Sequence, residues 1–387
     1  MKITLERTPE QVELIKAMAS KNRDVAYEAQ TALAEFIGPV LAEVVNAAPT
    51  VSNMFTSLQF NSDESPSIPL DLYHDITDED YIQVWSQSVA GGLPTNQVAP
   101  SQSELKFTTY TLDSALSFDK RYASRSRLDV VSKTFTRMAQ EILLKQEKTS
   151  ASMIMTALAN ATTNTEKHVM RSAQSGRFLL SDLNKLFTKA KRINTSWTGG
   201  TPADRRGRGI TDLLVSPEIV EEIRGLAYNP INSRGGAGGA PTAGDGIAGT
   251  DSMRDAIFNS AGIPEFYGVS IQEYNEMGDG QKWNDVFKVA SAGIDYADNY
   301  SVAQSTGGFE FQDSSITTAG NEQILVGVDL SRESMIRAVA TDSESGDEFS
   351  LVSDDQFVTR QSKIGYYGSL EEGRMIIDDR VLLGLIV

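Results

Sequence analysis

Apolar residues recur at alternating spacings of three and four in the middle of the chain, which is the period of one helical face. The residues that carry this repeat are Leu128, Val131, Phe135, Met138 and Ile142. Neither glycine nor proline occurs from Ser101 to Ser175, so no turn signal interrupts the pattern. It predicts one helix from about Arg127 to Asn160, roughly 50 Å long at ~1.5 Å per residue. Such a length suits a structural spine.

The N-terminal segment predicts a second helix with a defined start. Thr8 is placed to cap it, Pro9 fits the first helical position, and Gln11 completes a capping box. Apolar positions keep the helical period as far as Ile37. The pair Gly38-Pro39 then predicts a break or a kink.

Residues 60–118 predict an extended loop with two β arms. The stretch 61–69 is rich in Ser, Asp and Pro, and residues 90–94 form a second turn-rich tip. From Glu104 to Phe118, apolar residues alternate with Thr and Ser, as in a strand that returns from the excursion. Little between the arms can build a core.

The second half of the chain contains both the helical and the strand period of apolar residues, which indicates an α+β chain. Ser181 predicts the N-cap of an amphipathic helix that ends before Gly199, and residues 213–215 predict a buried strand followed by Ser216-Pro217 and a helix. Further on, we expect a helix at 251–261 and a strand at 266–271. The tail predicts strands at 324–328, 335–340, 356–363 and 375–387, although 331–334 can equally open a short helix.

Length and composition limit the class of protein. The chain has 387 residues, of which 40% are hydrophobic, enough for two or three domains with real cores. No apolar run approaches the ~20 residues of a membrane span, and the first residues lack the apolar centre of a secretory signal, so we expect no membrane partner and a cytosolic origin. The absence of cysteine excludes disulfides and thiolate metal sites.

Charge is divided between two stretches of opposite sign. Asp24 to Leu105 holds twelve carboxylates and no lysine or arginine, whereas Lys120 to Ile210 holds eighteen basic residues against six acidic ones. The basic excess equals the acidic one, so the nearest complementary surface is the protein itself or another copy. The competing interpretation is two solvated faces of unrelated elements. The formal net charge of −17 argues against a simple binder of polyanions.

Motifs for catalysis are scarce. Both histidines, His74 and His168, are expected at the surface rather than as general bases. Gly244 to Gly249 matches a dinucleotide fingerprint, but a glycine-rich stretch precedes it instead of a buried strand, so we expect a flexible loop. An acidic cluster near residue 78 can attract a cation, but a solvated surface is the preferred interpretation. Arg205 to Arg208 can contact phosphates or a neighbouring subunit's carboxylate. We therefore expect no catalytic residue, no cofactor and no metal site.

Three stretches, in this order, are similar to a known family of proteins. They are Glu104-Leu105-Lys106-Phe107 leading into Leu116-Ser117-Phe118-Asp119, the strand-Ser-Pro-helix unit from Asp212 to Arg224, and Ile263-Pro264-Glu265-Phe266-Tyr267-Gly268-Val269. With the helical arm before them and the strand-rich tail after them, the chain resembles the major capsid protein of tailed double-stranded DNA bacteriophages, which has the Hong Kong 97-type fold.

The resemblance implies a domain plan and a function. Residues 1–58 would be the N-terminal arm, 59–115 the E-loop, 116–208 the P-domain with its spine helix, joined by part of 341–387, and 209–340 the A-domain. Hexamers and pentamers would close into an icosahedral head around double-stranded DNA, without sequence-specific binding. Assembly would take place in the host cytoplasm and the product would be the virion capsid. A separate scaffolding protein, a portal and a decoration protein are the implied partners.

The resemblance also gives the charge division a mechanism, because in that family the E-loop lies over the P-domain of the adjacent subunit. The expected contact joins an acidic set to a basic set: Asp75, Asp78, Glu79 and Asp80 on the loop, and Arg125, Arg127 and Arg137 on the spine. A glycine-rich loop near a hexamer or pentamer axis is expected at Arg234, Gly235, Gly236, Gly238 and Gly239. The alternatives are an encapsulin-like compartment shell and a dinucleotide-binding enzyme.

Overall fold

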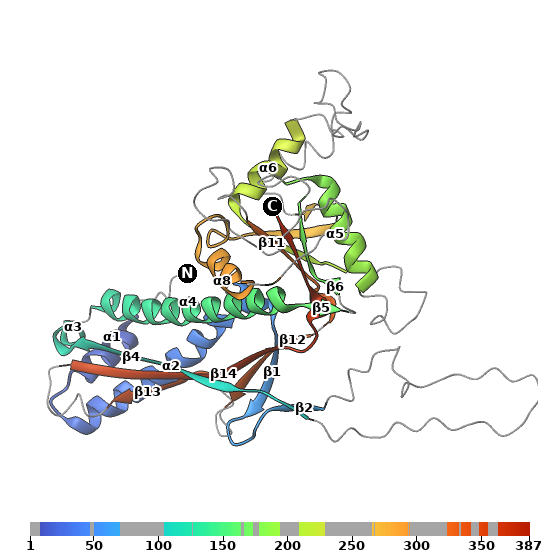
Figure 1. Ribbon diagram of the computed structural model, residues 1–387. Helices are drawn as coiled ribbons and strands as arrows, with labels where there is room; N and C mark the ends of the chain where they lie inside the picture. The colour runs from blue at the N-terminus through green and yellow to red at the C-terminus, as the bar shows by residue number, and fades with distance from the viewer. Residues whose placement is uncertain are drawn as a thin grey trace, which may run out of the picture. The chain divides into compact units, whose positions relative to one another are not determined.

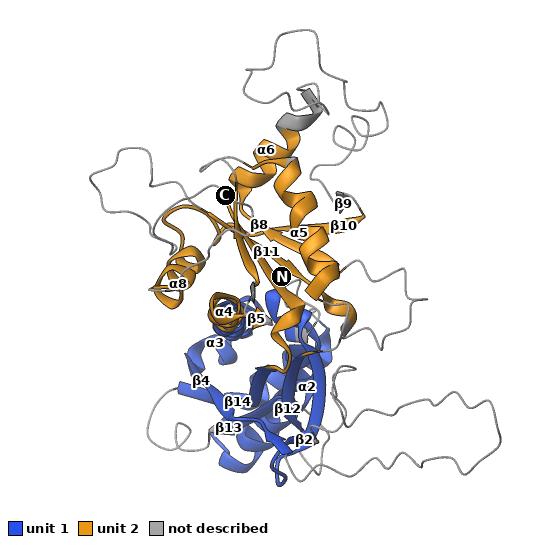
Figure 2. Cartoon of the chain, turned by 45° about the vertical axis from the view of Figure 1, so that its right-hand side comes forward, with its two compact units in different colours: residues 1–70, 101–151, 335–375 blue, residues 71–100, 152–334, 376–387 orange. Residues whose placement is uncertain are grey.

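Figure 1 shows the helices and strands of the computed structural model. The described residues are 8–46, 50–69, 104–125, 127–163, 166–172, 178–193, 209–228, 265–266, 268–292, 294, 323–332, 334–341, 348–354 and 363–387. The chain divides into two compact units, each discontinuous in sequence (Figure 2). Unit 1 comprises residues 1–70, 101–151 and 335–375, and unit 2 comprises 71–100, 152–334 and 376–387. Helices and strands are present in both, so the predicted α+β class is confirmed.

Unit 1 begins with two helices, α1 (Pro9–Met18) and α2 (Arg23–Asn46). As predicted, Thr8 caps α1, its Oγ1 accepting the backbone N–H of Gln11 at 3.4 Å. The predicted break at Gly38-Pro39 is wrong, because α2 continues through Pro39. Burial of Leu33, Ile37 and Leu41 on one face of α2 holds the helix across the proline, whose cost is confined to one missing hydrogen bond and a local clash. The helical segment is interrupted instead at residues 19–22, between α1 and α2.

The spine is α4 (Leu128–Asn160), one helix of 33 residues, which confirms the helix predicted from the apolar period. Residues 128–151 belong to unit 1 and 152–160 to unit 2. In unit 1 its core-facing residues pack with α2 and with the sheet described next. They are Val131, Phe135, Met138, Ala139 and Ile142, all buried.

The sheet of unit 1 is built from distant parts of the sequence. Its order is β1 (Thr56–Asn61), β12 (Met335–Thr341), β14 (Lys363–Ile376) and β13 (Ser350–Asp354), and β4 (Thr109–Asp119) also pairs with β14. The β4–β14 pair is antiparallel along the whole of β4, from Thr109 opposite Gly373 to Asp119 opposite Lys363. Alternate residues of β14 therefore face the core, where Tyr366 meets the ring of Phe135 edge-on at 5.4 Å.

One glycine of β14 is required by this packing. A Cβ atom at Gly368 would overlap Cε of Met138 on the spine and Cζ of Phe349. The core of unit 1 thus leaves no room for a side chain at that position.

The arms of the predicted loop start from unit 1. A 3-10 turn, η1 (Val51–Met54), precedes β1, and β2 (Ser67–Pro69) pairs with β3 (Glu104–Lys106) in an antiparallel ladder. This ladder brings the two ends of the intervening segment together. Between β4 and the spine lies the short helix α3 (Lys120–Ser124), capped by the carboxylate of Asp119.

Unit 2 contains a six-stranded sheet. Its order is β7 (Val169–Arg171), β15 (Leu382–Ile386), β11 (Ile324–Val328), β8 (Asp212–Val215), β10 (Val269–Glu273) and β9 (Glu265–Phe266). Helices α5 (Leu180–Ile193) and α6 (Pro217–Tyr228) share an apolar cluster with these strands. Ser216 Oγ accepts the N–H of Ile219 at 3.3 Å, as predicted for the strand-Ser-Pro-helix unit. A two-stranded ladder, β5 (Thr162–Thr163) with β6 (Glu166–Lys167), follows the end of the spine.

Several local predictions for the second half need correction. Helix α5 starts at Leu180, so Ser181 lies inside it rather than at its cap. The predicted strand at 375–387 is interrupted, because β14 ends at Ile376 and the 3-10 turn η4 (Asp379–Val381) precedes β15. Of the two options at 331–334, the helical one holds in part as the 3-10 turn η3 (Leu330–Arg332). Helix α8 (Lys282–Ala290) was not predicted. The helix expected at 251–261 and most of the strand expected at 356–363 lie outside the described residues.

Candidate functional site

The structure describes only the basic half of the predicted contact between subunits. Arg125 is the C-cap residue of α3, Arg127 immediately precedes α4, and Arg137 lies on α4; all three side chains are exposed. None of them forms an ion pair with another described residue. The acidic residues Asp75, Asp78, Glu79 and Asp80 and the loop residues Arg234, Gly235, Gly236, Gly238 and Gly239 lie outside the described part of the chain, as do His74 and the glycine motif at 244–249.

A buried ion-pair cluster in unit 1 was not predicted from the sequence. On β14, Glu372 and Arg374 pair with each other at 2.5 Å, and both side chains are fully shielded from water. Arg337 on β12 donates from Nε to the same carboxylate at 2.9 Å. A carboxylate between two guanidinium groups satisfies charges that would otherwise be very costly to bury.

Three polar side chains complete this cluster. Arg374 also donates to the hydroxyl oxygens of Ser52 and Tyr110, and Gln146 of the spine donates to Glu372 at 3.0 Å. Burial raises the pKa of Tyr110 to about 12, an effect that Arg374 opposes and Glu372 reinforces. Close by, Glu147 accepts the backbone N–H of Val51 at 2.9 Å.

The cluster therefore connects the segment before β1, the returning arm β4, the spine and the C-terminal strands within unit 1. Its signal in the sequence was the spacing of Glu372 and Arg374, which places both on the same face of a strand as the buried Tyr366 and Leu370. Charged side chains on the buried face of a strand need ion-pair partners within the core.

His168 also departs from its prediction. We expected it at the surface, but it is fully buried in unit 2 between β7 and the C-terminal segment. Its Nδ1 lies 3.0 Å from the carbonyl oxygens of both Asp379 and Leu382, so Nδ1 carries the proton and donates to them. Burial lowers the pKa of His168, which favours the neutral ring. The geometry indicates a structural role, in which the ring fixes the turn that leads into β15.

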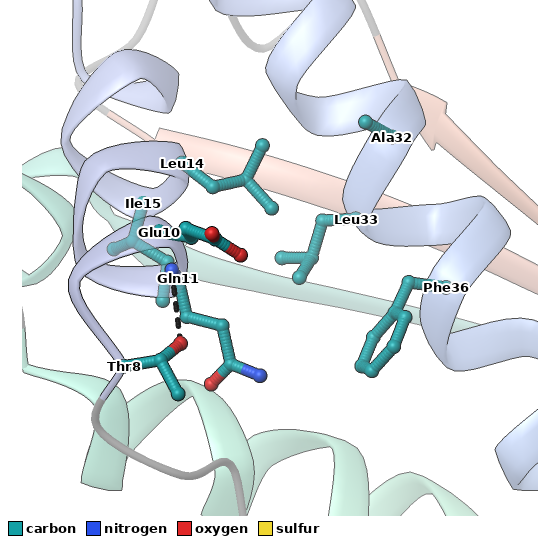
Figure 3. Close-up of a pocket in the computed structure, with 8 residues that line it drawn as sticks. All are labelled: Thr8, Glu10, Gln11, Leu14, Ile15, Ala32, Leu33 and Phe36. Atoms are coloured by element: carbon teal, nitrogen blue, oxygen red, sulfur yellow. Dashed lines mark hydrogen bonds between the residues drawn. The ribbon is translucent and has the colours of Figure 1, made fainter.

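A groove lies between the two N-terminal helices (Figure 3). Its volume is about 480 Å³ and its lining is Thr8, Glu10, Gln11, Leu14, Ile15, Ala32, Leu33 and Phe36. Leu14 from α1 and Leu33 from α2 face each other across it, and Phe36 is 55% exposed. The lining is mainly apolar and includes one carboxylate, that of Glu10.

Comparison with known proteins gives matches in structure alone. No protein-family model matches the chain, and no curated protein matches it in sequence. The capsid structure of the cyanophage P-SCSP1u is similar, with a TM-score of 0.44 and 13% identity over 86% of each chain. The SrpI encapsulin of Synechococcus elongatus is similar with a TM-score of 0.42 and 10% identity, over 89% of this chain and 93% of that chain. The mature capsid of bacteriophage PhiM1 is similar with a TM-score of 0.44 and 8% identity, over 87% of this chain and 86% of that chain.

No group of three or more His, Cys, Asp or Glu side chains is arranged to hold a metal ion in the described ranges. Among the helices that the structure describes, none is long and apolar enough to cross a bilayer.

Proposed function

We propose that the chain is a major capsid protein of a tailed bacteriophage, whose hexamers and pentamers close into an icosahedral head. The observation that carries the proposal is the order of elements, with the 33-residue spine at its centre. The spine follows a pair of arms that, among the described residues, pair with each other at β2 and β3, and it precedes the strand-Ser-Pro-helix unit. Arms with little core of their own gain stability by lying on another subunit.

The domain plan remains part of the proposal. Residues 1–58 form the arm, 59–115 the E-loop, 116–208 with part of 341–387 the P-domain, and 209–340 the A-domain. Supporting it, the arm, β4 and the spine of unit 1 share the buried cluster around Glu372. A rigid joint at the base of the E-loop would aim the loop at the adjacent subunit.

The contact between subunits would be electrostatic. The acidic loop residues Asp78, Glu79 and Asp80, with Asp75, would lie on Arg125, Arg127 and Arg137 of the next copy. Exposure of the three arginines supports this, because no described carboxylate of the same chain neutralises them. Complementary charge of this kind specifies register more than it adds affinity.

The remaining expectations follow from the shell function. The glycine-rich loop at 229–250 would lie near a hexamer or pentamer axis, where protease would cut free subunits faster than assembled shells; equal rates would contradict that location. Scaffolding, portal and decoration proteins would be separate chains, and assembly would take place in the host cytoplasm. A net charge of −17 lets packaged DNA leave without adhering to the wall. The chain would carry no enzymatic activity.

Electron microscopy of the purified chain tests the proposal. We expect closed shells of uniform size, alone or with a scaffolding protein added. Light scattering that shows only monomers or dimers under all salt, divalent-cation and scaffold conditions would overturn it. Nuclease-resistant DNA inside particles from infected cells would separate a phage head from an encapsulin-like compartment.

A further inference from the structure

Strand β1 lies at an edge of the sheet in unit 1 and is exposed on both of its faces. Its partner among the described strands is β12, and the residues from Thr56 to Gln59, with Asn61, are exposed. The strand contains no charged residue and no proline, the two features that most often keep another strand from pairing with an edge. By contrast, the edge strand β4 carries Asp113 and Asp119. The edge of β1 is therefore suited to the addition of a further strand.

The backbone of β1 indicates which of its groups face this edge. In a strand, the N–H and C=O groups of one residue point to the same side, and those of the next residue point to the other side. Ser62 donates its N–H to the carbonyl of Thr341 on β12 at 3.1 Å, so the even-numbered residues point toward β12. Ser57 and Gln59 consequently direct both of their backbone groups to the open edge, where no described strand pairs with them.

The flanking positions on the same side of the strand are half satisfied within the chain. The N–H of Phe55 donates to the carbonyl of Ser52 at 3.3 Å. The carbonyl of Asn61 accepts the N–H of Glu64 at 2.9 Å. The edge therefore offers its full set of donors and acceptors only at the centre of the strand.

The same strand of a second copy complements this edge. A two-fold axis perpendicular to the sheet would run the second β1 antiparallel to the first. With Ser57 opposite Gln59 of the other copy, each pair exchanges two hydrogen bonds, so that all central groups are used. The remaining N–H of Asn61 then faces the remaining C=O of Phe55. A register centred on Ser57 or on Gln59 would instead place central groups opposite flanking groups that already have partners.

The side chains fit this register. Thr56, Leu58 and Phe60 share one face of the strand, and Leu58 is 37% exposed. Leu58 would lie on the axis, opposite its own equivalent, and Thr56 would lie opposite Phe60. These are the pairs without backbone hydrogen bonds, whose side chains approach most closely in an antiparallel ladder. Pairing would cover an apolar row that a single copy leaves open.

We propose that β1 pairs with β1 of a second copy across a two-fold axis, with Leu58 at the axis. The contact is isologous, because both copies use the same surface. The proposal deepens the shell function and rests on it. A contact between an acidic loop and a neighbouring spine is heterologous and closes subunits into rings, whereas a self-complementary surface joins one ring to the next. The two contacts share no residue.

Single cysteines test the axis directly, because the chain has no cysteine of its own. Leu58→Cys would bring two equivalent Cα atoms to ~4.5 Å, within the range for a disulfide. Ser57→Cys and Gln59→Cys are matched controls on the same strand, since their equivalents would lie about 8 Å apart, beyond that range. Thr56→Cys combined with Phe60→Cys is a second test, and its thiols are ~13 Å apart within one chain.

Each variant is assembled, checked for normal shells by electron microscopy, oxidised and run on a denaturing gel without reductant. We expect Leu58→Cys to form disulfide-linked dimers at least about tenfold more than either control. The double variant should crosslink as well. Stronger linkage of Ser57→Cys or Gln59→Cys would overturn the register. Normal shells in which Leu58→Cys and the double variant both stay monomeric would overturn the contact and leave the shell function intact.

A charge at the axis gives a test that needs no oxidation. Leu58→Lys would place two ammonium groups opposite each other, which destabilises a cross-strand pair. We expect rings to form while the yield of closed shells falls at least about tenfold, as like charges across a contact cost several kcal/mol. Val352→Lys, at a position of β13 that is 53% exposed, is the control and should keep its yield. Equal yields would contradict the contact.

A different segment of a neighbouring subunit is the competing occupant of this edge. In that case Leu58→Cys would stay monomeric in normal shells, and the pairing of β1 with itself would be wrong. Failure of the unmodified chain to form any shell would be a failure of the proposed function, which microscopy records before oxidation. The two results are therefore distinguishable.

Discussion

Glu372 and Arg374 lie two residues apart on β14 and form an ion pair at 2.5 Å in which neither side chain is reached by water. Arg337 shares the carboxylate of Glu372, so the cluster holds two guanidinium groups around one acid. Its stability depends on that acid, because removal of Glu372 would leave two cations buried without compensation.

We predict that Glu372→Gln destabilises the chain by about 3–5 kcal/mol, the usual cost of breaking a buried ion pair from one side. Denaturant unfolding followed by circular dichroism measures the change. Glu371→Gln is the matched control on the neighbouring, half-buried position. Equal stability of the two variants would show that the buried cluster around Glu372 does not hold the base of the proposed E-loop rigid.

A second prediction concerns pH and His168. Its folded-state pKa is lowered by burial, so the unfolded chain binds the proton more readily and stability falls as pH drops below about 6.5, the unperturbed value. Asn places an amide N–H where Nδ1–H donates to Asp379 and Leu382, without titrating. We expect His168→Asn to reduce the loss of stability between pH 7 and pH 5. Thermal unfolding across that range measures it, and unchanged pH dependence would contradict a neutral buried ring.

Gln30 on α2 gives a third prediction. It is fully buried, and neither amide atom has a hydrogen-bond partner among the described residues. An unpaired buried amide costs about 1–3 kcal/mol, so Gln30→Leu should raise the free energy of unfolding by a similar amount. The control is Gln140→Leu at an exposed position of the spine, expected to change stability by less than about 0.5 kcal/mol. A destabilised Gln30→Leu variant would indicate a partner outside the described residues.

The fourth prediction tests the charge contact of the proposed function. Reversing Asp78, Glu79 and Asp80 to lysine should impair shell formation far more than subunit folding, because like charges forced together across an interface cost several kcal/mol. Exposed parts of the contact are screened beyond ~8 Å at physiological salt, so the defect should be largest at low salt.

Partial recovery is expected when that variant is combined with Arg125, Arg127 and Arg137 changed to glutamate, as in a double-mutant cycle. Shell yield by sedimentation is the readout, and circular dichroism is the control for folding. If no recovery occurs while both chains fold, these surfaces do not touch.

The sequence by itself determined the local elements. The spine from Leu128 to Asn160, the Thr8 cap and the Ser216-Pro217 helix start were predicted because their signals lie within a few turns of chain: an apolar period, a side-chain oxygen near free N–H groups, and a proline with preset φ.

Tertiary structure decided the local conformation where a sequence signal conflicted with contacts to residues far away in the chain. Pro39 breaks an isolated helix, but α2 is held across it by the core around Ile37. His168 has ordinary polar neighbours in the sequence, but its buried ring donates to the backbone carbonyls of residues more than 200 positions away. The same holds for β1 beside β12 and for Arg337, which donates to Glu372 from 35 residues away. These contacts join segments far apart in the chain, so no window of sequence contains the partner whose burial and charge decide the outcome.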